Sequence, residues 1–64
     1  MSADLDHQMR RVKGHLDAAA DYARRAKNYA NSEDTDAASS NIRKAADEID
    51  NALALVNRIR RDLI

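Results

Sequence analysis

Cationic residues recur in two matching groups in the first half of this 64-residue chain. The second group follows the first by two heptads, which on a helix is about four turns, or about 21 Å. Both groups therefore lie on one outer face, and such a face is able to contact the phosphates of a nucleic acid. The basic ridge, as we call this face, consists of Arg10, Arg11, Lys13, Arg24, Arg25 and Lys27, extended by Tyr22 and Tyr29.

Acidic and aromatic residues close to the basic ridge leave three interpretations open. Asp6 and Asp21 precede Arg10 and Arg25 by four residues, a spacing at which opposite charges pair on a helix. Such pairing favours an ordinary solvated helix surface, whereas unpaired cations favour contact with phosphates or with an acidic protein partner. The two tyrosines either cover the margin of a hydrophobic core or stack on exposed bases.

The residue types required for catalysis or metal binding are scarce. There is no cysteine, which excludes disulfides and thiolate metal sites, and the two histidines are too few for a zinc site without carboxylate ligands. The sequence contains no Gly-rich phosphate loop, no Glu-x-x-His pair and no His-Glu-x-x-His motif. We therefore expect a non-enzymatic protein with no catalytic residue, no cofactor and no bound metal.

Apolar residues recur at alternating steps of four and three along both halves of the chain, which is the a/d pattern of a coiled coil. The pattern predicts two long helices that pack through their apolar stripes, and hence an all-α fold. The predicted core consists of Leu5, Met9, Val12, Leu16, Ala19, Ala23, Ala26, Ala30, Ala38, Ile42, Ala45, Ile49, Ala52, Val56, Ile59 and Leu63.

A wholly polar segment over residues 31–36 separates the two apolar patterns and predicts a turn. The second pattern restarts at Ala38, two residues out of step with the first, and one continuous helix would not explain this slip. Asn31 is suited to the left-handed conformation that ends a helix, and Asp34 or Thr35 to the cap that begins the next one. An antiparallel hairpin is therefore favoured, and a single unbroken helix is the alternative.

The expected fold is one domain over residues 1–64, with helix 1 over about 3–31, a turn over about 32–35 and helix 2 over about 36–63. Alone, such a hairpin would leave half of its apolar pattern exposed, and a chain this short usually needs a partner. Large core residues lie toward the open end and alanines toward the turn, so two hairpins with turns at opposite ends give layers of even volume. We predict a homodimer that forms an antiparallel four-helix bundle.

The composition bears on the compartment and on the class of partner. Eleven cations balance 11 anions, so no overall charge directs the chain to nucleic acid or to a membrane. No stretch approaches the roughly 18 apolar residues of a membrane span, and the N-terminus lacks the apolar run of a signal peptide. We expect a soluble cytoplasmic protein without membrane contact.

A chain of this length, with two heptad-patterned helices, a short polar turn and core layers that mix small and large residues, resembles the Rop family of plasmid copy-number proteins. The resemblance is architectural and extends over the whole chain. It implies an antiparallel dimer of hairpins that binds paired RNA loops through polar residues of helix 1, where the ridge residues Arg10, Arg11, Arg24 and Arg25 stand.

Two hypotheses of function follow. The first is a small regulatory or adaptor protein, a homodimeric four-helix bundle that binds another protein. Leu53 and Leu55 widen the apolar face of helix 2 and serve either the dimer contact or a groove for a partner helix. The alternative is binding of RNA, or of another nucleic acid, through the basic ridge, and such binding would weaken steeply with salt.

Overall fold

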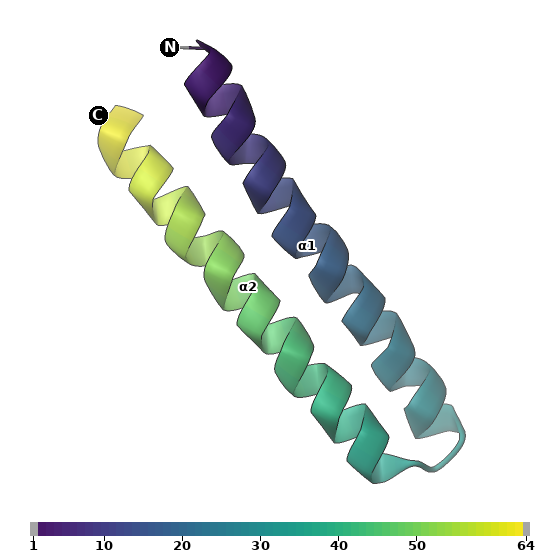
Figure 1. The fold of residues 1–64 in the computed structure, drawn as a ribbon. Coiled ribbons are helices and arrows are strands. Elements are labelled where there is room, and N and C mark those ends of the chain that lie inside the picture. Colours follow the sequence, from purple (N-terminus) through teal and green to yellow (C-terminus); the bar gives the residue numbers. More distant parts are fainter. Residues whose placement is uncertain (1, 64) are drawn as a thin grey trace.

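The computed structural model describes residues 2–63, and these form two antiparallel helices joined by a short turn (Figure 1). Helix α1 spans Ser2–Asn31 and helix α2 spans Thr35–Leu63. The start of α1 and the end of α2 lie at one end of the hairpin, and the turn lies at the other. The predicted all-α hairpin is confirmed, and the single unbroken helix is excluded. Met1 and Ile64 lie outside the described residues.

The turn ends α1 with a Schellman motif, which satisfies the last carbonyl groups of the helix. The amide of Glu33 donates to the carbonyl of Ala30 at 3.0 Å, and the amide of Asp34 donates to the carbonyl of Tyr29 at 2.9 Å. Glu33 takes the left-handed position of the motif, with φ of 62°. Glycine usually occupies this position because a Cβ atom is crowded there.

The residues on either side of Glu33 show how one helix stops and the next begins. The expectation that Asn31 would be left-handed is wrong, because Asn31 is still helical and Glu33, two residues later, takes the positive φ. The amide of Ser32 still donates to the carbonyl of Asn28 at 3.2 Å. Asp34 caps α2, as predicted, since its Oδ1 accepts the amide of Ala37 at 3.1 Å. Both helix ends at the turn therefore have partners for their terminal backbone groups.

Seven of the 16 residues of the predicted core are buried between the two helices. The buried members recur every seven residues on each helix and are small or β-branched, which allows the helices to approach closely. We call them the inner row: Val12, Ala19, Ala26, Ala38, Ala45, Ala52 and Ile59. Towards the open end of the hairpin, Val12, Ala52 and Ile59 form a cluster with Leu55, against which Val56 packs.

A second set of residues completes the contact between the helices on one side of the inner row. These residues stand three positions after Leu5 or after a member of the inner row, and all are buried or half-buried: Gln8, His15, Tyr22, Asn41, Glu48 and Leu55. Asn41 is only 9 % exposed, and its Nδ2 donates to the carbonyl of Ala37 in its own helix at 2.8 Å. This hydrogen bond allows a polar residue to occupy the interface.

The hairpin is a single layer of two helices, with Cα extents of 48 × 17 × 10 Å. Its exposed area is 5079 Å², whereas a compact monomer of the same mass exposes about 4100 Å². Two helices side by side have two broad faces, and no other described residue covers either of them.

Replacing Glu33 by glycine is expected to raise the free energy of unfolding by about 0.5–1 kcal/mol, because glycine adopts a positive φ without the crowding that a Cβ atom causes. Urea denaturation followed by circular dichroism, at one protein concentration, measures the change. Glu33→Ala is the control: it removes the same carboxylate but keeps the Cβ atom, so it should change stability much less. Equal gains for both variants would assign the effect to charge and contradict the backbone explanation.

Candidate functional site

Eight members of the predicted core, all exposed except the half-buried Val56, gather on one broad face of the hairpin. Its members follow Leu5 or an inner-row residue by four positions on both helices. In an antiparallel pair, this offset turns them to the same side, opposite the residues that follow by three. We call this the apolar face: Met9, Leu16, Ala23, Ala30, Ile42, Ile49, Val56 and Leu63. The expectation that a lone hairpin leaves half of its apolar pattern exposed is confirmed.

Large side chains occupy the apolar face from its open end to beyond its middle. Met9, Leu16, Ile42, Ile49 and Leu63 are between 46 % and 68 % exposed. Leu53 borders the same face on α2 and is also exposed, whereas Leu55 lies on the other side of the inner row and is buried. A contiguous set of exposed large apolar side chains on a small chain marks an interaction surface.

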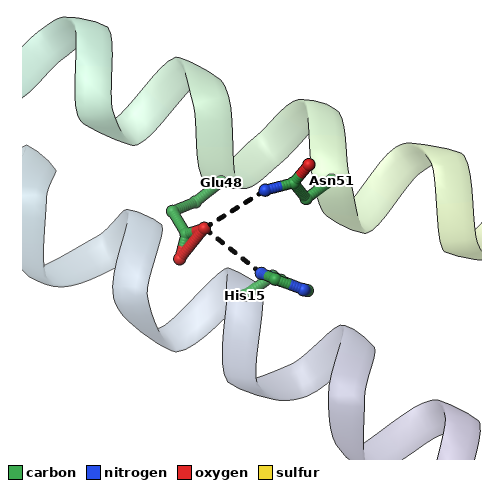
Figure 2. Close-up of polar contacts among 3 residues, drawn as sticks. All are labelled: His15, Glu48 and Asn51. Atoms are coloured by element: carbon green, nitrogen blue, oxygen red, sulfur yellow. Dashed lines mark hydrogen bonds and ion pairs between the residues drawn. The ribbon is translucent and has the colours of Figure 1, made fainter.

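The opposite broad face is polar, and a side-chain contact joins the helices there. Figure 2 shows His15 of α1 and Asn51 of α2 pointing toward the carboxylate of Glu48. The distance from His15 Nδ1 to Glu48 Oε1 is 3.2 Å, and Asn51 Nδ2 donates to the same oxygen at 3.4 Å. Because His15 and Glu48 belong to different helices, their contact links α1 to α2 on the polar face.

The structure distributes the basic ridge over three sides of α1. Arg10 and Arg24 point outward, away from α2. Arg11 and Arg25 directly precede the inner-row residues Val12 and Ala26, which places them beside the polar face. Lys13 and Lys27 directly follow the same two residues and stand beside the apolar face. The ridge residues thus face three different directions around α1.

Three cations of the ridge are paired with carboxylates of their own helix. The pairs are Arg10 with Asp6 at 3.0 Å, Lys13 with Asp17 at 2.8 Å and Arg24 with Asp21 at 2.9 Å. The hydrogen bond to Asp17, together with Coulombic attraction, raises the pKa of Lys13 above its ordinary value. The four-residue spacing predicts a pair between Asp21 and Arg25, but Asp21 pairs with Arg24 instead. Exposed pairs of this kind contribute little to stability.

Tyr22 is approached by cations from both helices. The guanidinium carbon of Arg25 lies 5.6 Å from the ring centroid, and Nζ of Lys44 lies 5.8 Å from it. Both distances are within the range of cation–π attraction. Lys44 belongs to α2, so the cationic surface extends across the hairpin. Lys44 could not be recognised from the sequence, because a pattern on one helix does not show which residue of the other helix lies opposite.

Tyr29 and the arginines near the end of α2 complete the candidate residues. Tyr29 is exposed and makes no aromatic–cation contact with the described residues. A shallow groove near the end of α2 is lined by Ala54, Asn57, Arg58, Arg60 and Arg61. A second depression, at the open end, is lined by Asp4, Leu5, Gln8, Ile59, Asp62 and Leu63.

The comparisons with known proteins add no family to this description. No protein-family model, no curated protein and no solved structure matches the chain. Within residues 2–63, no three histidine, cysteine, aspartate or glutamate residues are arranged to hold a metal ion. Neither of the described helices has a stretch long and apolar enough to cross a membrane.

Replacing Glu48 by alanine is expected to lower the free energy of unfolding by about 1 kcal/mol, because the half-buried His15 and the exposed Asn51 lose their common acceptor. Glu48→Gln keeps an acceptor oxygen at the same position and should cost less than half as much. Thermal unfolding at matched protein concentration measures both changes. If the two variants lower the free energy of unfolding equally, the stabilisation comes from the charge of the carboxylate. That result would contradict the explanation by hydrogen bonds.

Proposed function

We propose that the chain is a non-enzymatic regulatory or adaptor protein that works as a homodimer and binds another protein. In this proposal two hairpins join through their apolar faces and form an antiparallel four-helix bundle. The observation that carries it is the apolar face, on which five large side chains are roughly half exposed or more. Covering such a face with a second copy removes apolar area from water, which is the main force in association.

The size of the exposed surface suits a second copy of the chain. The hairpin exposes 5079 Å², about 1000 Å² more than a compact monomer of its mass. A specific protein–protein interface of standard size buries about 800 Å² on each partner. One partner hairpin therefore accounts for the excess.

The distribution of large and small residues favours one orientation of the dimer. With turns at opposite ends, Leu63 lies against the partner's Ala30, and Val56 lies against the partner's Ala23. In the middle, Leu16 lies against the partner's Ile49, and every layer has a similar volume. With both turns at one end, leucines would meet leucines and alanines would meet alanines. That core would be overfilled at one end and loosely packed at the other.

The edges of the apolar face support the same orientation. When the turns are at opposite ends, each α2 runs antiparallel beside the α2 of the partner. Leu53, 56 % exposed in the hairpin, then covers the partner's Ala46. On the α1 side, Lys27 stands beside the partner's Asp6, so opposite charges meet at that edge.

Leu16→Ala tests whether the apolar face is buried in solution. In the dimer this truncation should cost about 2–5 kcal/mol per site, as large-to-small changes in a core do. In a lone hairpin, where Leu16 is 48 % exposed, it would cost about 1 kcal/mol or less. Urea denaturation at several protein concentrations gives the value and its dependence on association.

Tyr29→Ala is the matched control for this truncation. The exposed fraction of Tyr29 is 41 %, similar to that of Leu16, but Tyr29 lies outside the apolar face. Its loss should leave the molecular mass in sedimentation equilibrium at that of a dimer. A wild-type protein that sediments as a folded monomer at micromolar concentration would contradict the dimer.

A single spin label at the turn tests the orientation. The chain has no cysteine, so Ser32→Cys gives one labelling site per protomer. With turns at opposite ends, the two labels are separated by a distance close to the 48 Å length of the hairpin. With turns at one end, they are about 10–20 Å apart, as neighbouring helices dictate. Pulsed dipolar spectroscopy separates the two distances, and the shorter one would overturn the proposed arrangement.

A further inference from the structure

We infer that the polar face of each hairpin docks an acidic α-helix of another protein, held at its two ends by two pairs of cations. The inference rests on the proposed role as a protein-binding dimer and adds the chemistry of the partner. The docking cations, as we call them, are Arg11, Arg25, Lys44 and Arg58.

The register of the hairpin places the docking cations in two pairs. Arg25 and Lys44 each lie near the ring of Tyr22, at 5.6 and 5.8 Å from its centroid. Arg11 precedes Arg25 by two heptads, and Arg58 follows Lys44 by the same interval. Because the helices are antiparallel, both steps lead toward the open end by about 21 Å. The second pair therefore lies across the two helices as the first pair does.

The charges of the docking cations are available to a partner. None of the four forms an ion pair with another described residue, whereas three cations of the basic ridge do. Arg25 and Lys44 each approach the ring of Tyr22, one from each helix. A carboxylate of a partner helix that reaches either cation would form a charge-assisted contact with it.

The spacing of the pairs fits a helix. A helix that lies along the polar face, parallel to α1 and α2, returns to nearly the same face after two heptads. Acidic side chains separated by that interval would reach both pairs. Hydrogen-bonding groups of His15, Glu48 and Asn51 lie on the face between the two pairs (Figure 2).

The same face is poorly suited to a nucleic acid. Phosphates follow one another every few ångströms along a strand, so they would also meet the carboxylates of Asp4, Glu48 and Asp62 on this side of the hairpin. The chain carries 11 cations and 11 anions, and thus has no net charge to attract a long polyanion. Separated carboxylates suit two separated cation pairs better than a continuous line of phosphates does.

Two synthetic helical peptides test the inference by fluorescence anisotropy at low salt. One carries two glutamate pairs separated by two heptads. The other has the same composition, but its second pair is moved two positions along the chain, which turns that pair to the opposite side of the helix. The first peptide should bind the full chain at least about tenfold more tightly, a difference of about 1.4 kcal/mol. Equal affinities for the two peptides, or no binding of either, would overturn the inference.

Two variants of equal charge locate the binding surface. Replacing all four docking cations by glutamine should weaken binding of the first peptide at least about tenfold. The control replaces Arg10, Lys13, Arg24 and Arg43 by glutamine and should retain the affinity within about twofold. Equal losses in the two variants would contradict docking on the polar face, because only total charge would then matter.

Two further measurements separate the inference from its alternatives. Sedimentation equilibrium of both variants reports the dimer independently, so loss of assembly is distinguished from loss of peptide binding. A short duplex RNA serves as competitor. If the RNA binds more tightly than the first peptide and depends on the same four cations, the polar face is a nucleic-acid surface and the inference is wrong.

Discussion

An apolar stripe with heptad spacing is wider than the contact that a single neighbouring helix can cover. In this hairpin each helix buries one row of its stripe against the other and leaves the second row exposed. The burial of Val12 and the exposure of Leu16, one turn further along α1, illustrate the division. The exposed apolar face and the thin shape of the hairpin both follow from this difference between the width of the stripe and the contact that one helix can cover.

The elements themselves were predictable from the sequence. The heptad pattern identified both helices, and the phase slip at Ala38 located the turn, because a continuous helix keeps its phase. The left-handed residue was not predicted correctly. Glu33 has low intrinsic preference for a positive φ, and the hydrogen bonds that end α1 depend on the geometry of the turn as a whole.

The core was predicted as a set of residues, but its division between two surfaces was not. Alternating steps of four and three place Met9 and Val12 in one stripe and do not show which of them faces the other helix. Asn41 escaped notice because a hydrogen bond within its own helix, invisible in the pattern of apolar residues, permits its burial. The prediction of the candidate site had the same limit. The sequence shows how cations are spaced along α1, but not that Tyr22 is approached by one cation from each helix.

The opposition of the two broad faces has a consequence for stoichiometry. If the apolar faces of two copies are joined, their polar faces point away from each other, one on each flat side of the bundle. A dimer of this kind is bivalent and would hold two ligands back to back and about one bundle diameter apart. Bivalency converts a modest affinity at each face into strong attachment when the two ligands belong to one assembly.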